Sequence, residues 1–133
     1  MRFNNDRPIF AQIADQLTAD VLAGLLKPGD RLPSARDLGT IFEVNPNTAA
    51  RALQMLADSG LAGLARGTGY TVAADGLASA RRERKERFRK DRLPGFFTEM
   101  SMLGIDMSEI LQLYGEWKAA VAATTAPGGA ASA

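Results

Sequence analysis

Three side chains that can pair with DNA bases are spaced about one helical turn apart in the segment 46–59. Asn47, Arg51 and Gln54 fall on one side of a helical wheel drawn at about 100° per residue. In a DNA major groove, Arg can pair with guanine, and Asn or Gln with adenine, through two hydrogen bonds each. For this segment alone an ordinary amphipathic surface helix is the better explanation. The neighbouring segments decide between the two.

Both ends of this segment carry helix-boundary residues. Asn45 can cap the start by accepting a hydrogen bond from a free backbone N–H, and Pro46 suits the first helical position. Gly60 suits the left-handed conformation that often follows a helix. We therefore predict one amphipathic helix, with Thr48 flanking its polar side. The small and apolar residues that can bury on the opposite side are Ala49, Ala52, Leu53 and Leu56.

Two further helices are predicted upstream. Apolar residues recur every fourth position over 9–26, and Pro28-Gly29 ends that pattern. Ser34 followed by Asp37 resembles a capping box for a helix over 35–42. Helix, short turn and helix form the helix-turn-helix layout, in which the second helix enters the major groove. The expected buried residues are Ile9, Ile13, Leu17 and Val21 in the first helix and Leu38, Ile41 and Phe42 in the second.

The residues that flank these helices add two features. Arg36, near the start of the helix over 35–42, is well placed for a phosphate contact, and a solvated surface arginine is an equally good explanation. Arg31-Leu32 can form a very short strand.

A glycine-rich hairpin is predicted after the helix-turn-helix. Residues 61–65 and 70–73 are strand-like, and Arg66-Gly67-Thr68-Gly69 joins them. The tip is not a nucleotide-binding loop, because Val72 stands where the motif needs a third glycine and no helix follows. A hairpin directly after a recognition helix is a wing. Its Arg66 and bare glycine backbone can approach the minor groove or a phosphate.

Composition excludes several classes of function. The chain has no Cys and no His, which removes thiolate nucleophiles, disulfides, Cys/His zinc sites and imidazole acid–base chemistry. We predict no enzymatic activity, no metal site and no cofactor. The N-terminal residues lack a signal-peptide core, and no apolar run is long enough to span a membrane. We expect a soluble, cytoplasmic protein.

The net charge of +1 is unevenly distributed. Residues 1–76 carry 7 basic and 8 acidic groups, whereas residues 77–92 carry 8 basic and 3 acidic groups. DNA-binding domains are usually basic overall. Any affinity of the first part must therefore come from local placement of its cations and from having two copies. A solvated helix is the better explanation of the basic run over 81–92, and a phosphate contact is the alternative.

The C-terminal part is predicted to be a helical arm. Asp75-Gly76 is interpreted as a hinge, residues 77–103 are helical in pattern with a kink at Pro94, and Asp106 can cap a last helix over 107–117. Two short apolar helices cannot build a core alone. We predict that they pack against a second copy, the alternative being the helix over 9–26. The residues assigned to the dimer interface are Leu93, Phe96, Phe97, Met100, Leu103, Ile110, Leu111 and Tyr114.

A long ordered motif resembles the GntR family of bacterial transcription regulators. It comprises Pro28-Gly29-Asp30-Arg31-Leu32-Pro33-Ser34-x-Arg36-x-Leu38, Val44-Asn45-Pro46-Asn47-Thr48, Arg51-Ala52-Leu53, Gly60-Leu61 and Gly67-Thr68-Gly69-Tyr70-x-Val72, where x is any residue. The resemblance implies a winged helix-turn-helix that binds palindromic operators as a dimer. It also implies DNA contacts by Arg36, Asn47, Thr48, Arg51 and the wing tip Arg66-Gly67.

Two departures and one agreement refine this resemblance. Many family members have Arg where this chain has Pro46 and Ala50, so base recognition here depends more on Asn47 and Arg51. The Asn-Pro-Asn-Thr form resembles the YtrA-like branch, which carries only a short helical C-terminal part that serves for dimerisation.

The predicted fold is mainly α with a small β-hairpin. Residues 1–75 form the winged helix-turn-helix domain, 76–118 the helical dimerisation segment, and 119–133 a low-complexity disordered tail. The predicted function is a DNA-binding repressor that acts as a homodimer on a double-stranded operator, and a small-molecule effector is left open. The alternative is a winged-helix protein-interaction module without DNA binding. The predicted DNA contacts are Arg36, Asn45, Asn47, Thr48, Arg51, Gln54, Arg66, Gly67 and Thr68.

Overall fold

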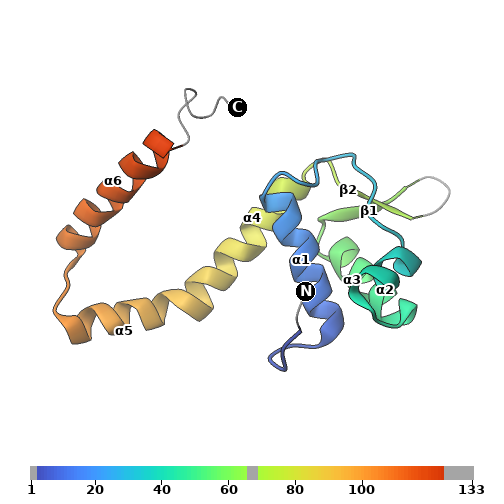
Figure 1. The fold of residues 1–133 in the computed structure, drawn as a ribbon, viewed down its shortest axis with the longest axis horizontal. Helices are drawn as coiled ribbons and strands as arrows, with labels where there is room; N and C mark the ends of the chain where they lie inside the picture. The colour runs from blue at the N-terminus through green and yellow to red at the C-terminus, as the bar shows by residue number, and fades with distance from the viewer. Residues whose placement is uncertain (1–2, 66–68, 125–133) are drawn as a thin grey trace. The chain divides into compact units, whose positions relative to one another are not determined.

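The computed structural model describes residues 3–65 and 69–124 (Figure 1). It is mainly α with a two-stranded antiparallel hairpin, which confirms the predicted fold class. The chain divides into two compact units, and the division falls between Glu86 and Arg87. The domain boundary predicted after residue 75 stays a prediction. No helix in the described ranges is long and apolar enough to cross a membrane.

Helix α1 (Ile9–Leu22) ends earlier than the predicted residue 26. Gly24 adopts a left-handed φ of +82°, and the backbone N–H groups of Leu25 and Leu26 both bond to the carbonyl of Asp20. This turn removes Leu25 from the apolar face, so its side chain is exposed. Ile9 is also exposed at the start of the helix, while the remaining predicted positions, Ile13, Leu17 and Val21, are buried.

Helix α2 (Ala35–Phe42) begins with the predicted capping box. The N–H of Asp37 donates to Ser34 Oγ at 3.0 Å, and the N–H of Ser34 donates to Asp37 Oδ2 at 3.4 Å. Leu38 is buried as predicted, but Ile41 is 62% exposed, so the prediction for Ile41 is wrong. The buried pair is Leu38 and Gly39, and at about 100° per residue Ile41 lies about 110° around the helix from that pair.

Helix α3 (Pro46–Asp58) packs against both α1 and α2. Its predicted apolar side is confirmed, since Ala49, Ala52, Leu53 and Leu56 are all buried. Gly60 follows the helix with a φ of +87°, the left-handed conformation expected there.

The hairpin consists of β1 (Ala62–Leu64) and β2 (Tyr70–Val72), shorter at the ends than predicted. Its register pairs Ala62 with Val72 and Leu64 with Tyr70. The predicted strand at Arg31-Leu32 is an isolated bridge between Arg31 and Thr71, supported by an N–H to carbonyl bond from Leu32 to Tyr70 at 2.9 Å. The segment before α2 is thereby held to the base of the hairpin.

Helix α4 (Gly76–Arg87) corrects our interpretation of Asp75-Gly76 as a hinge. Gly76 is buried, and a Cβ placed on it would lie 2.7 Å from Val72 Cγ1 and 3.0 Å from the carbonyl oxygen of Leu61. Ala80, one turn further on, is 1% exposed within the same core. The glycine therefore permits close packing of α4 on the hairpin.

The second unit contains a π-helical segment (Phe88–Arg92) and the helices α5 (Leu93–Leu103) and α6 (Met107–Thr124). The helical stretch predicted over 77–103 is thus divided near Pro94, where we expected a kink or a break. Pro94 lies in the first turn of α5, where its missing N–H is tolerated. Helix α5 is followed by Gly104, whose φ is +73°.

Helix α6 begins as predicted but extends further. Asp106 Oδ1 accepts hydrogen bonds from the Ser108 hydroxyl at 2.8 Å and the Glu109 N–H at 3.0 Å. These bonds favour the carboxylate and hold the pKa of Asp106 below its ordinary value. The predicted end near residue 117 is wrong, and residues 119–124, assigned to the tail, are helical. The rest of the predicted tail, 125–133, lies outside the described residues.

Gly76→Ala should destabilise the first unit by about 1–3 kcal/mol, the usual cost of overpacking a core. The new methyl group would press on Val72 and the Leu61 backbone. Urea denaturation of the whole protein at a fixed concentration measures the loss. Gly95→Ala is the matched control, because no atom lies within 4 Å of a Cβ there. Equal stability of the wild type and Gly76→Ala would restore the hinge interpretation.

Candidate nucleic-acid interface

The start of α3 is fixed by its own cap. Asn45 Oδ1 accepts a hydrogen bond from the N–H of Asn47 at 2.7 Å, and Pro46 occupies the first helical turn. The side-chain carbonyl oxygen of Asn45 thus caps the helix as predicted, and the DNA contact that we also assigned to Asn45 stays a prediction. The side chain of Asn47 is exposed, and Thr48 is half-buried.

Arg51 is exposed, as predicted, but its surroundings are not those of an isolated surface cation. Its guanidinium carbon lies 4.1 Å from the centre of the Phe10 ring. Phe10 belongs to α1 and packs against the core. No sequence pattern indicated this contact, because the two residues are far apart along the chain.

Gln54, the third predicted base-pairing residue, already has a partner within α3. Its Nε2 donates to Asp58 Oδ1 at 2.9 Å, and both residues are exposed. This pairing of residues four apart is common on helix surfaces. It competes with any bond from Gln54 to a base, so Asn47 and Arg51 remain the stronger candidates.

Helix α2 meets the start of α3 closely at the turn. A Cβ on Gly39 would lie 2.9 Å from the Val44 carbonyl oxygen and 3.4 Å from Pro46 Cγ. Glu43 occupies the turn with a left-handed φ of 57°, which few residues other than glycine adopt. The tight turn positions α2, and with it the exposed Arg36, relative to the recognition helix.

A cation from the segment before α2, which we did not predict, lies beside the wing. A Cβ on Gly69 would lie 3.1 Å from Arg31 Nη2, so the guanidinium of Arg31 lies against the wing backbone. The bridge between Arg31 and Thr71 explains this placement. The predicted wing contacts Arg66, Gly67 and Thr68 lie outside the described residues.

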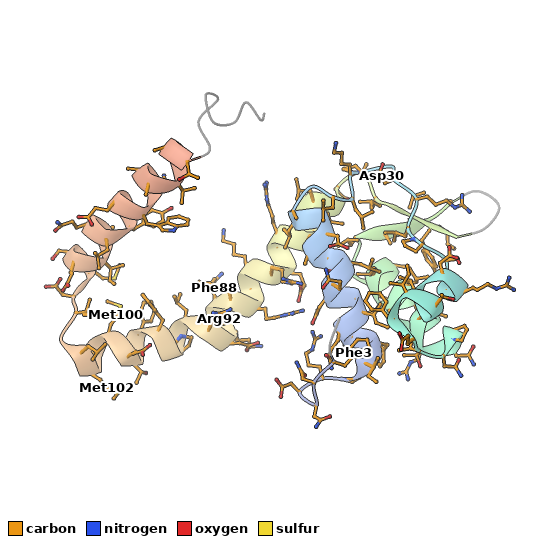
Figure 2. The ribbon with its side chains drawn as sticks, viewed as in Figure 1. Phe3, Asp30, Phe88, Arg92, Met100 and Met102 are labelled. Carbon is orange, nitrogen blue, oxygen red and sulfur yellow. The ribbon has the colours of Figure 1, made fainter. Side chains whose placement is uncertain are left out.

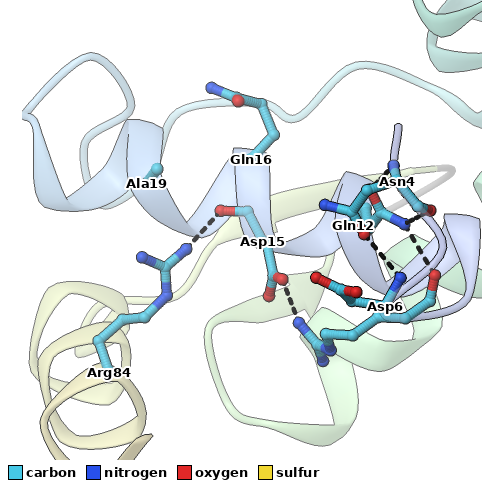
Figure 3. Close-up of a pocket in the computed structure, with 8 residues that line it drawn as sticks. Asn4, Asp6, Gln12, Asp15, Gln16, Ala19 and Arg84 are labelled. Carbon is cyan, nitrogen blue, oxygen red and sulfur yellow. Dashed lines mark hydrogen bonds and ion pairs between the residues drawn. The ribbon is translucent and has the colours of Figure 1, made fainter. Parts of the chain in front are cut away.

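A polar groove of about 330 Å³ lies beside α1 (Figure 3). Arg7 forms an ion pair with Asp15, and Arg84 donates to the backbone carbonyl of Asp15 at 2.7 Å. The buried Gln12 donates to the carbonyls of Asn4 and Arg7 at 2.8 and 2.7 Å. These hydrogen bonds and the ion pair hold the N-terminal segment and α4 against α1. They also give Arg84, in the basic run, a structural role.

Two helices joined by a tight turn, followed by a β-hairpin and with Asn47 and Arg51 exposed on the second helix, define a winged helix-turn-helix DNA-binding protein. The chain belongs to the GntR family: the sequence model of bacterial regulatory proteins of the gntR family matches residues 10–72. Within the described ranges, no cluster of acidic side chains could hold a metal ion.

Two relatives from Bacillus subtilis place the chain in the YtrA-like branch of that family. It is 34% identical to the HTH-type transcriptional regulator YhcF, over 84% of this chain and 90% of that protein. It is 33% identical to the HTH-type transcriptional repressor YtrA, over 77% of this chain and 78% of that protein.

A solved structure agrees with this assignment. A GntR family transcriptional regulator from Listeria monocytogenes superposes with a TM-score of 0.68 at 29% identity, covering 86% of this chain and 98% of that one. The match includes most of both chains, so the fold of the family is present here beyond the DNA-binding domain.

Asn45→Ala should lower the free energy of unfolding by about 1 kcal/mol, because the N–H of Asn47 loses its side-chain partner. Asn45→Ser should retain most of the stability, since a hydroxyl can replace the amide oxygen. Urea denaturation measures both variants. Asn47→Ala, which removes an exposed side chain two residues on, is the control. An alanine variant as stable as the wild type would contradict the capping role of Asn45.

Proposed function

We propose that this protein is a transcriptional repressor that binds a palindromic DNA operator as a homodimer. The observation that carries the proposal is the exposed start of α3, where Asn47 and Arg51 follow a capped helix end in a helix-turn-helix of the GntR family. The assignment as a repressor is supported by the similarity to YtrA, which is named a repressor. A protein that acts on chromosomal DNA belongs in the cytoplasm.

The candidate residues other than Asn45 and Gln54, whose side chains bond within or at the start of α3, receive roles from their chemistry and position. Arg51 and Asn47 read base edges, because they offer forked donors or a donor–acceptor pair on the exposed side of α3. Arg36 at the start of α2 and the predicted wing contacts Arg66, Gly67 and Thr68 hold phosphates, which position the protein without reading sequence. Thr48, half-buried at the edge of the same surface, contacts the backbone or a neighbouring base.

The test is a selection of binding sites from a random duplex library, followed by titrations at one fixed salt concentration. The wild type should select inverted half-sites whose centres are about one helical turn apart. It should bind the selected duplex about 1,000-fold or more tightly than a scrambled duplex of the same composition. Failure to select any sequence would favour the alternative, a winged-helix module that binds proteins.

Two substitutions separate the proposed roles within that experiment. Arg36→Ala should weaken binding to the selected and scrambled duplexes alike. It should also reduce the slope of log K against log salt by about 0.9 for each phosphate that the variant no longer neutralises.

Arg51→Ala should reduce the binding free energy by about 1–3 kcal/mol per half-site on the selected duplex and by far less on the scrambled one. Arg51→Lys should not retain full affinity, because an ammonium lacks the planar fork. Equal losses for Arg51→Ala on both duplexes would reassign Arg51 to the phosphates.

The proposed dimer rests on an apolar surface within the second unit. Phe96, Phe97 and Leu103 of α5 and Leu111 and Tyr114 of α6 are each between 44% and 68% exposed. Large exposed apolar patches mark interaction surfaces in soluble proteins. Met100 is an exception among the predicted interface residues, because it is only 8% exposed on the side of α5 toward α6, whereas Met102 points away (Figure 2).

Leu111→Asp should convert the dimer to monomers, because a carboxylate would be buried without a partner in the proposed interface. We expect the dimer dissociation constant to rise by at least about a hundredfold. Sedimentation equilibrium measures the change. Gln112→Asp, which places the same charge on the neighbouring exposed residue of α6, is the control. A Leu111→Asp protein that sediments as a dimer would exclude this face of α6 from the interface.

A further inference from the structure

We propose that Phe10 is a positioning residue for DNA recognition, because it holds the guanidinium of Arg51 in the orientation that a base pair requires. The inference rests on the proposed function, since it assumes that Arg51 reads DNA. It adds a residue from α1, outside the helix-turn-helix, to the parts that determine operator specificity.

The contact joins two helices whose relative position is fixed. The Arg51 guanidinium carbon lies 4.1 Å from the Phe10 ring centre, within the range of a cation–π interaction. Phe10 is the second residue of α1, and the nearby residues Ala11 and Ile13 are buried at 2% and 0% exposure. The ring is therefore carried on a helix that cannot shift without disturbing the core.

The chemistry of the contact leaves the recognition groups of Arg51 available. An aromatic ring interacts with the flat face of a guanidinium, whereas the N–H donors point outward in its plane. Within the described residues, the side chain of Arg51 has no hydrogen-bond acceptor and no ion-pair partner. The stack consequently fixes the plane of the fork while its donors stay free for a guanine.

Pre-orientation matters because an arginine side chain otherwise loses much rotamer freedom when it binds. A side chain already stacked on Phe10 has undergone part of that loss during folding. The neighbouring candidate Gln54 illustrates the opposite case, since one N–H of its amide is already donated to Asp58, which directs the side chain along its own helix. The stack therefore favours Arg51 as the base reader of α3.

The experiment compares Phe10→Leu with the wild type on the duplex selected by the wild type and on its scrambled counterpart. Loss of the stack should weaken binding to the selected duplex about 2- to 5-fold per half-site, and about 4- to 25-fold for a dimer, the effect of an exposed cation–π contact. Binding to the scrambled duplex should change little. Phe10→Tyr, which keeps the ring, should bind like the wild type.

Phe42→Leu is the matched control. Phe42 is also half-buried in the same unit, but its ring contacts Phe3, at 6.1 Å between centres, instead of Arg51. Phe42→Leu should affect stability without changing the preference for the selected duplex. Equal loss of that preference in both leucine variants would show that Phe10 acts through general stability and would overturn the proposal.

A double-mutant cycle isolates the route through Arg51. In the Arg51→Ala background, Phe10→Leu should not change the affinity for the selected duplex any further. An undiminished effect there, unchanged binding by Phe10→Leu, or tighter binding would each overturn the proposal. A wild type that selects no duplex would instead contradict the proposed function.

A second measurement does not depend on DNA or on the stability of any variant. In the wild-type protein, NMR of the Arg51 side chain should show its Cδ and Nε protons shifted upfield by the Phe10 ring. Shifts equal to those of an unstacked arginine would overturn the stacked orientation itself.

Discussion

The packing of α3 on α1 is the constraint on which the candidate interface depends. Ala49 and Ala52 of α3 are fully buried in the core that includes this packing, with 0% exposure each. Side chains this small let helices approach closely. Their burial leaves the opposite side of α3 exposed to solvent. The directions of the exposed Asn47 and of Arg51, whose guanidinium lies over the Phe10 ring, follow from this packing. A larger side chain at position 49 or 52 would displace α3, and with it every candidate base contact at once.

Local hydrogen bonding made several boundaries predictable from the sequence. The caps at Ser34, Asn45 and Asp106 each bond to a residue two or three positions further along the chain. Such signals need no knowledge of the tertiary structure. The exposure of Ile41 and the burial of Gly76 could not be predicted, because they depend on which elements pack on α2 and α4. The α1 end at Leu22 depended on a left-handed turn at Gly24, which the longer apolar pattern concealed.

In the candidate site, too, features set by local sequence could be predicted, whereas features set by tertiary packing could not. The residue types of α3 predicted a surface of base-pairing side chains, and the structure leaves Asn47 and Arg51 exposed. The pairing of Gln54 with Asp58 was accessible to sequence reasoning, since it joins residues four apart in one helix. The contact of Arg51 with Phe10 was not, because it requires the packing of α1 on α3.

The charge balance explains why orientation of individual cations matters in this protein. Residues 1–76 carry 7 basic and 8 acidic groups, so their net charge does not attract DNA. Some of these cations also serve the fold, as Arg7 does through its ion pair with Asp15. With little general attraction, a proposed half-site must be bound through a few well-oriented groups. In the proposed dimer, a second copy would add another such set at high effective concentration. Two weakly binding domains joined in a dimer would therefore bind two correctly spaced half-sites far more tightly than one domain binds one half-site. A surface with scattered basic residues would not distinguish correctly spaced half-sites from other DNA.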